Sequence, residues 1–293
     1  MTDSAALGQL ARQALERGDE AAAAPVLAAA AGRAGDDAQL WQWSALLHRA
    51  LHQHAVALHA FVKAAALAPG DGSIAYGRAL AALEAGLDAV PLFEAAARVL
   101  PNNGDVMLGL AAARFAAGDG ARGIADLDAV LAGSPGWIAG HHGLARLRCL
   151  MGERDAATAS LDRALAAWPG DFALWQALVQ TLAQGDRFDA ALDAIRRGRA
   201  AAGGNIFFDA NEAVALSETG DAAGADALFA RLADVDEPGF AVRRVRHLLR
   251  TGRVEAALPL VERFAVPESP LTVPAAVNGT PAGGGLLSPG RLQ

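Results

Sequence analysis

The sequence predicts an all-α protein, a right-handed superhelical α-solenoid of about eight helix–turn–helix repeats with a disordered C-terminal tail, and three observations predict it. The 293-residue chain is 53% hydrophobic but holds only 10 Phe, 5 Trp and 1 Tyr, because alanine dominates. Alanine favours helices and lets them pack closely, while the long Val-, Ile- and Thr-rich runs typical of strands are missing. Turn residues and apolar pairs recur with a nearly constant period inside the ~20–50 residue range typical of solenoid repeats.

Proline marks the breaks between repeats. Pro69, Pro101, Pro135 and Pro169 follow one another at almost equal intervals. Proline cannot continue the helix before it and biases the preceding residue away from helical angles. Asp171, which follows Pro169 and Gly170, offers a carboxylate that caps the next helix. These short breaks predict helices that fold back antiparallel and stack.

Within each repeat a small residue precedes a large apolar residue by four positions. The small residues are Ala23, Ala57, Ala89, Gly123, Ala157, Ala191, Ala225 and Ala257. The large ones are Leu27, Phe61, Phe93, Leu127, Leu161, Ile195, Phe229 and Val261. Both members of such a pair lie on one helical face, so the small residue admits a neighbouring helix and the large one fills the groove beside it.

Glycine marks the turn between the two helices of most repeats, since it closes a helix in the left-handed conformation at little steric cost. The turn glycines are Gly18, Gly86, Gly118, Gly152, Gly185, Gly220 and Gly252, and His52 stands where the second repeat should have one. We expect helix pairs at residues 4–17/20–33, 37–51/54–67, 71–84/88–99, 104–117/120–133, 137–150/154–167, 171–184/187–202, 206–219/222–234 and 238–251/254–265.

The second repeat shows most clearly which family the chain resembles. Its marker residues are Trp41, Ser44, Ala45, Ala57, Phe61, Ala64 and Pro69. This pattern resembles the tetratricopeptide repeat (TPR), and the match covers about residues 4–265, weakest in repeats one, seven and eight. The resemblance implies a solenoid domain over 1–265, with units 4–35, 36–69, 70–101, 102–135, 136–169, 170–203, 204–237 and 238–265. It also implies a concave groove lined by the first helix of each pair.

The remaining residues, 266–293, form a separate segment rich in Pro and Gly, which predicts a flexible, disordered tail. The formal net charge of -7 argues against nucleic acid and anionic membranes as main partners. The apolar run 21–31 is too short to span a bilayer, and the N-terminus lacks the pattern of a secretory signal. Because Cys149 is the single cysteine, we expect no intramolecular disulfide and a cytoplasmic location.

No catalytic motif stands out, so we expect no enzymatic activity and no cofactor. Gly-x-Ser-x-Gly, the phosphate loop and a Gly-x-Gly-x-x-Gly after a strand are all absent from the sequence. His48 and His52 have the i, i+4 spacing of a helical metal site, with His54 and His59 close by, yet no Cys or carboxylate nearby in sequence completes a shell. We therefore predict no metal site. Asp126 and Asp128 are expected to be solvated surface.

Binding is the remaining role. The family pattern implies groove-facing side chains on the first helices at Gln39, Gln42, Arg49, Arg78, His142, Arg146, Gln176 and Gln180. Arginines among amides suit the backbone and carboxylates of an extended peptide. The Lys and Asn clamp with which some TPR proteins hold a C-terminal carboxylate is incomplete here. Trp41, Trp168 and Trp175 are expected to pack between repeats.

The predicted function is that of a non-catalytic scaffold or adaptor, in the alanine-rich style of bacterial TPR proteins, that binds a protein or peptide in the groove. Two alternatives stay open. In the first, the chain is the recognition half of a longer TPR-fused enzyme (2-oxoglutarate/iron oxygenase-like, sulfotransferase or glycosyltransferase) whose catalytic domain is absent from it. In the second, the chain self-associates through the ends of the solenoid.

Overall fold

The computed structural model describes residues 4–233 and 238–264, and within them every regular element is an α-helix. The helices are α1 (Ser4–Arg17), α2 (Glu20–Ala34), α3 (Ala38–Ala50), α4 (His54–Leu67), α5 (Gly72–Glu84), α6 (Val90–Val99), α7 (Gly104–Ala116), α8 (Gly120–Gly133), α9 (Ile138–Leu150), α10 (Arg154–Ala167), α11 (Phe172–Gln184), α12 (Phe188–Ala202), α13 (Ile206–Thr219), α14 (Ala222–Arg231), α15 (Pro238–Arg250) and α16 (Val254–Phe264). The predicted all-α solenoid of helical pairs is confirmed. The predicted disordered tail lies outside the described residues.

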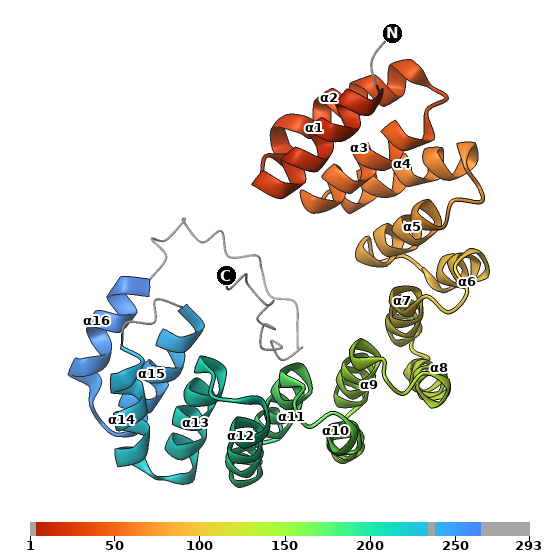
Figure 1. Ribbon diagram of the computed structural model, residues 1–293. Coiled ribbons are helices and arrows are strands. Elements are labelled where there is room, and N and C mark those ends of the chain that lie inside the picture. Colours follow the sequence, from red (N-terminus) through yellow and green to blue (C-terminus); the bar gives the residue numbers. More distant parts are fainter. Residues whose placement is uncertain (1–3, 234–237, 265–293) are drawn as a thin grey trace. The chain divides into compact units, whose positions relative to one another are not determined.

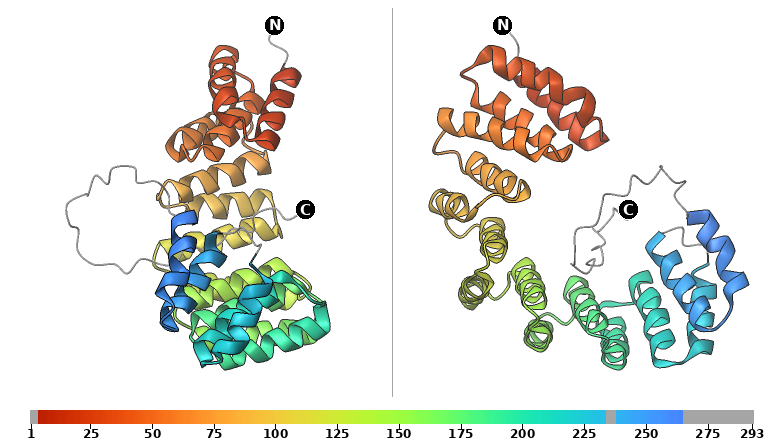
Figure 2. Two further views of the ribbon diagram at one scale, coloured as in Figure 1. Left: turned by 90° about the vertical axis from the view of Figure 1, so that its left-hand side faces the viewer. Right: turned by 180° about the vertical axis from the view of Figure 1, so that it is seen from behind.

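The chain divides into two compact units, Met1–Asp234 with α1–α14 and Val235–Gln293 with α15 and α16. In the first unit each helix packs against the next, and the first helix of each pair also packs against the first helix of the following pair. The second helices of neighbouring pairs do not pack in this way. The odd-numbered helices are therefore closer together and form the inner side of the stack (Figure 1 and Figure 2).

The small and large residues of the repeat occupy the predicted core. All eight small residues are buried, and the first seven large residues are at most 2% exposed. Val261 is the exception at 49%, because no further helix of the described residues packs over α16. For this last residue the expectation of a filled groove was wrong.

A left-handed residue closes the first helix of every pair. The eight residues with positive φ at this register are Gly18, His52, Gly86, Gly118, Gly152, Asp186, Gly220 and Gly252. The prediction of Gly185 was off by one position, since its φ is -94° and Asp186 has φ 56°. His52 also has φ 56° and lies beyond the end of α3 at Ala50. His48 and His52 are therefore not two sites on one helix, which corrects the spacing considered for a metal.

Glycine also permits close contact between repeats. A Cβ added to Gly77 would overlap the ring of Phe61, and one added to Gly109 would overlap the ring of Phe93. Between the fifth and sixth repeats the same two positions hold Leu161 and Ala177, which share a core cluster. A larger residue on one side of the contact is thus accompanied by a smaller one on the other, as close packing requires.

Two arginines at equivalent positions of α7 and α9 join neighbouring second helices. Arg114, almost fully buried, lies 3.3 Å from Glu94 of α6 and contacts Asp126 of α8. Arg148 forms a 2.7 Å ion pair with Asp128 of α8 and a hydrogen bond with Ser160 of α10. Asp126 and Asp128 are therefore ion-pair partners; Asp128 is exposed, as predicted, whereas Asp126 is half-buried.

Candidate functional site

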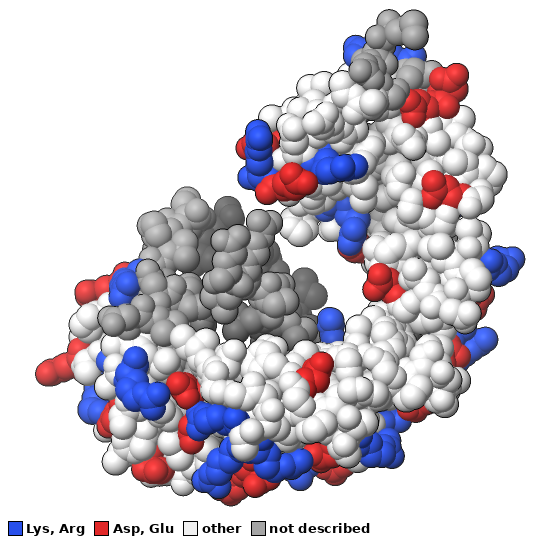
Figure 3. Space-filling view, viewed as in Figure 1, with Lys and Arg blue, Asp and Glu red and all other residues white. Residues whose placement is uncertain are grey.

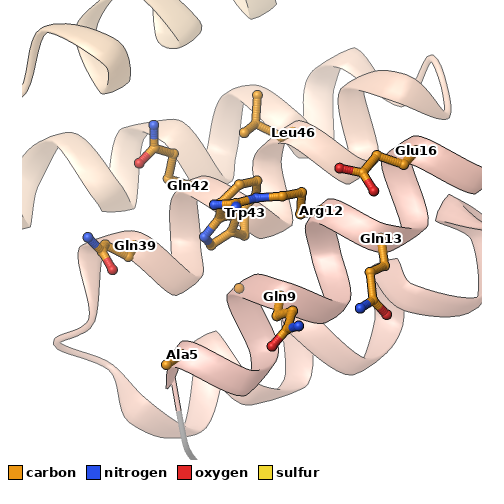
Figure 4. Close-up of a pocket in the computed structure, with 10 residues that line it drawn as sticks. Ala5, Gln9, Arg12, Gln13, Glu16, Gln39, Gln42, Trp43 and Leu46 are labelled. Carbon is orange, nitrogen blue, oxygen red and sulfur yellow. The ribbon is translucent and has the colours of Figure 1, made fainter.

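The inner side of the first two repeats contains an open pocket of about 580 Å³. Its lining residues from α1 are Ala5, Gly8, Gln9, Arg12, Gln13 and Glu16, and those from α3 are Gln39, Gln42, Trp43 and Leu46 (Figure 4). Gln39, Gln42 and Leu46 share one face of α3, since they are spaced by three and four residues. Ala5, Gly8 and Arg12 stand one repeat earlier and occupy the same face of α1. The pocket is therefore part of the inner face.

Trp43 forms the floor of this pocket because its large side chain is combined with a small residue, Gly8, on the neighbouring helix α1. At its register the next three first helices have Gly77, Gly109 and Gly143. The indole is accommodated by Gly8, where an added Cβ would lie 3.0 Å from Trp43 Nε1. The guanidinium carbon of Arg12 lies 6.0 Å from the centroid of the indole, and Figure 4 shows the Arg12 side chain across the ring. This is the geometry of a cation–π contact.

A hydrogen-bonded chain fixes Gln42. Its amide Nε2 donates to Ser73 Oγ at 2.7 Å, and Ser73 Oγ donates in turn to Asp71 Oδ1 at 2.6 Å. The same carboxylate caps α5 by accepting from the backbone N–H groups of Ser73 and Ile74. The Ser73 hydroxyl, followed by these backbone donors, lowers the pKa of Asp71 against an opposing effect of burial. Asp71, the N-cap residue of α5, therefore also orients Gln42 through Ser73.

His142 occupies the position in α9 that Gln42 occupies in α3. Its Nε2 donates to the backbone carbonyl of Ala173 at 2.5 Å, and both bonds join residues 31 positions apart in adjacent repeats. Arg49 pairs with Glu84 at 2.8 Å, and His54 lies 3.3 Å from the same carboxylate. Gln42, His142 and Arg49, three of the predicted groove residues, thus link one repeat to the next.

Arg146, Gln176 and Gln180 lie on the inner face, at the positions equivalent to Leu46, Gln42 and Leu46. Arg146 is exposed and both glutamines are half-buried. Across residues 4–233 and 238–264, their side chains form no hydrogen bond or ion pair. Tyr76 lies on the same face of α5, and burial, with a smaller contribution from Asp105, raises its pKa. The inner face between α5 and α11 is mostly neutral (Figure 3).

Arg78 is not brought to this face. It lies on the opposite side of α5 from Tyr76 and Leu80, two residues from each. At its register other first helices have the buried residues Ser44, Leu110, Leu144 and Leu178. Its Nε is buried and has no hydrogen-bond partner within the described part of the chain. The family pattern had implied a groove position for Arg78, and the residue instead occupies a packing position between helices.

The remaining candidates are structural. Trp175 is buried and donates through Nε1 to the carbonyl of Pro169 at 2.7 Å, while Trp41 and Trp168 pack against core clusters. His48 bonds to Gln53 at 2.6 Å, and the rings of His52 and His54 meet edge to face at 5.7 Å. Within the described ranges no three His, Cys, Asp or Glu side chains converge as metal ligands.

Comparison with known proteins identifies the class. Residues 87–136 and 143–206 match the family model of the tetratricopeptide repeat. A tetratricopeptide repeat protein from Parabacteroides merdae aligns with a TM-score of 0.55 and 13% identity over 86% of this chain and 97% of its own. Yeast Tom70 aligns with a TM-score of 0.61 and 16% identity over 83% of this chain and 54% of its own. The Cut9–Hcn1 hetero-tetramer of the APC/C gives 0.50 and 16%, over 87% of this chain and 48% of its own.

Residues 87–136 and 143–206 thus carry the sequence pattern of the tetratricopeptide repeat, and the fold of the described residues is similar to that of solved tetratricopeptide repeat proteins. At these identities the solved structures show the fold alone, and the chain spans about half the length of Tom70 and of the matched Cut9–Hcn1 chain. No curated protein matches the chain in sequence. Over the described residues no helix is both long and apolar enough to cross a membrane.

Sequence reasoning had found Gln39 and Gln42 but missed Arg12, Trp43 and the other residues of the pocket. The signal was available in the repeat period. Arg12 has the register of Arg146 four repeats later, and Trp43 stands at a register where the next three first helices have glycine. The first repeat departs from the family pattern, which is why that pattern did not point to its inner face.

Proposed function

We propose that this protein is a non-catalytic scaffold that binds a protein or an extended peptide along the inner face of α1–α14. The TPR fold generally serves as an interaction scaffold rather than a catalyst. The observation that carries the proposal is the row of polar side chains on the inner face, of which Arg146, Gln176 and Gln180 form no side-chain hydrogen bond or ion pair within the described residues. Gln42, His142 and Gln176 share one register, and Arg146 and Gln180 share another.

These side chains suit a peptide because amides and arginine offer donors and acceptors to a backbone that has both. The mostly neutral face favours a chain that contributes its own hydrogen bonds over one held by charge alone. The cytoplasm is the compartment we propose, since Cys149 is the one thiol of the sequence and would stay reduced there.

The test is capture of partners from a native lysate by the full chain and by two variants of equal charge. The inner-face variant carries Arg146→Glu and Gln180→Glu. The control carries Arg122→Glu on α8 and Ala166→Glu on α10, both exposed positions on second helices. Circular dichroism checks that all three forms have the same helicity.

We expect proteins that the wild type and the control retain and that the inner-face variant loses. Equal retention by all three forms would place binding elsewhere on the chain and contradict the proposal. Loss from both variants would point to general electrostatics rather than to the inner face, and would also contradict it.

A further inference from the structure

The pocket between α1 and α3 differs from the rest of the inner face in having an aromatic floor and two opposite charges. The chemistry of its ligand can be argued from these residues, and the argument rests on the proposed function because it concerns the same inner face.

Arg12 is available and oriented. Within the described residues it forms no ion pair, although Glu16 lies one helical turn further along α1. Its contact with the indole of Trp43 holds the guanidinium over the floor of the pocket. The planar guanidinium keeps its N–H donors in one plane, where a carboxylate can accept two of them. An oriented, unpaired arginine therefore favours a carboxylate ligand.

The amides supply the complement of a peptide backbone. Gln9, Gln13 and Gln39 make no side-chain hydrogen bond within the described ranges, so each offers a donor and an acceptor. Gln42 is held through Ser73, and its carbonyl oxygen stays available as an acceptor. Alternating donors and acceptors match an extended backbone, whose own N–H and C=O groups need partners.

The shape of the pocket sets the direction of such a segment. Its lining runs along α1 from Ala5 to Glu16, about 16 Å at 1.5 Å per residue. That length accommodates about five residues of extended chain at about 3.3 Å each. The pocket is open rather than enclosed, so a segment can enter and leave it without a free end.

Arg12 and Glu16 then define a spacing. They are separated by about 6 Å along the axis of α1. In an extended chain, residues i and i+2 point to the same side and are about 6.6 Å apart. A carboxylate opposite Arg12 thus places the side chain two residues away opposite Glu16, where a cation is favoured. A neighbouring residue of the peptide then lies against Trp43 and Leu46, which favour an apolar side chain.

We propose that this pocket binds an internal, extended peptide segment of a partner protein. In this segment an acidic and a basic residue are two positions apart, and a neighbouring residue is apolar. Arg12 binds the carboxylate, Glu16 binds the cation, and the indole of Trp43 packs against the apolar group. The glutamines bind the backbone.

A library of end-capped heptapeptides with randomised positions tests this ligand on the full chain. Capping removes both terminal charges, so enrichment reports internal residues only. Wild type is compared with Arg12→Gln, Glu16→Gln and Arg17→Gln, the last a control for net charge at the exposed end of α1. All three residues are exposed, and helicity is checked for each variant.

We expect enrichment of Asp or Glu two positions from Lys or Arg. Arg12→Gln should weaken binding of an enriched peptide at least tenfold and abolish the preference for the acid. Glu16→Gln should abolish the preference for the base alone, and Arg17→Gln should leave both unchanged. Arg12→Lys should restore part of the affinity, because the charge returns without the planar donor pair.

Three results would overturn the inference: no enrichment, enrichment without the charge pair, or a charge pair that Arg12→Gln does not affect. Peptides whose binding is lost in the Arg146→Glu and Gln180→Glu variant but kept in Arg12→Gln would also overturn it. That last result would leave binding to the inner face intact, so it separates failure of this ligand assignment from failure of the proposed function.

Discussion

Replacing Gly109 with alanine tests whether contact between repeats, rather than helix propensity, decides which residue this position tolerates. A Cβ on Gly109 would lie 2.6 Å from Cζ of Phe93, well inside ordinary contact distance. Phe93 is 0% exposed, so its ring cannot relieve the overlap by moving freely into solvent. Overpacking of this kind costs about 1–3 kcal/mol, which exceeds the gain of up to about 1 kcal/mol from alanine in a helix. We expect a net loss of stability.

The matched control is Gly32→Ala. Gly32 lies inside α2, and a Cβ added there would meet no atom within 4 Å. The same chemical change should therefore stabilise the protein by about 0.5–1 kcal/mol, through helix propensity alone. The same Gly→Ala substitution is thus expected to lower the stability of the protein at Gly109 and to raise it at Gly32.

A compensating change isolates the cause. Phe93→Leu removes ring atoms beside Gly109 and reproduces the combination of Leu161 with Ala177 between the fifth and sixth repeats. The double variant should recover part of the loss, with a coupling energy of about 0.5–3 kcal/mol, as for residues in direct contact.

Urea unfolding followed by circular dichroism measures these differences in stability, and native-state hydrogen exchange shows in which helices they occur. Exchange is needed because long repeat arrays do not always unfold in one cooperative step. Faster exchange should be confined to the helices that pack around Gly109. Equal shifts for Gly109→Ala and Gly32→Ala, or no recovery in the double variant, would refute the reasoning.

Three further tests, with four substitutions in all, concern other features. His52→Gly should stabilise by about 0.5–1 kcal/mol in thermal unfolding, because a left-handed non-glycine residue costs about 1–2 kcal/mol and glycine loses about 0.5–1 kcal/mol in entropy; unchanged or lower stability contradicts this. Leu161→Ala should cost about 2–5 kcal/mol and Val261→Ala below about 1 kcal/mol in the same assay, since the first is 0% and the second 49% exposed; equal losses would mean that Val261 is covered. Ser73→Ala should move the pKa of Asp71 back toward 3.8 in an NMR titration. Because the pKa of Asp71 is depressed, its ionised carboxylate stabilises the fold above the unfolded pKa, and this stabilisation is lost as pH falls through the folded pKa. The stability of the Ser73→Ala variant should therefore depend less on pH in that acidic range. An unchanged pKa would rule out the hydroxyl as the cause.

The helical pairs could be predicted from sequence because their determinants are local and recur. Proline breaks, turn glycines and small–large pairs act within one repeat, and the neighbouring repeats fix their phase. Two predicted positions were wrong because they were inferred from residue type alone. Gly185 fits the turn by residue type, although the backbone places the left-handed residue at Asp186. Arg78 fits a binding face by residue type, although side-chain direction on α5 takes it away from Tyr76.

The pocket could not be predicted from residue types alone, because it depends on a departure from the repeat. A tryptophan at the register of Gly77 would collide with the preceding helix in an internal repeat, where Phe61 fills that space. At Trp43 the first helix pair offers Gly8 on the neighbouring first helix, so the large side chain extends into the inner face instead. In this exchange the compensating residue, Gly8, lies about one period before Trp43. Sites in proteins of this kind are expected where the repeat pattern is broken, since local consistency is given up at functional positions more often than elsewhere.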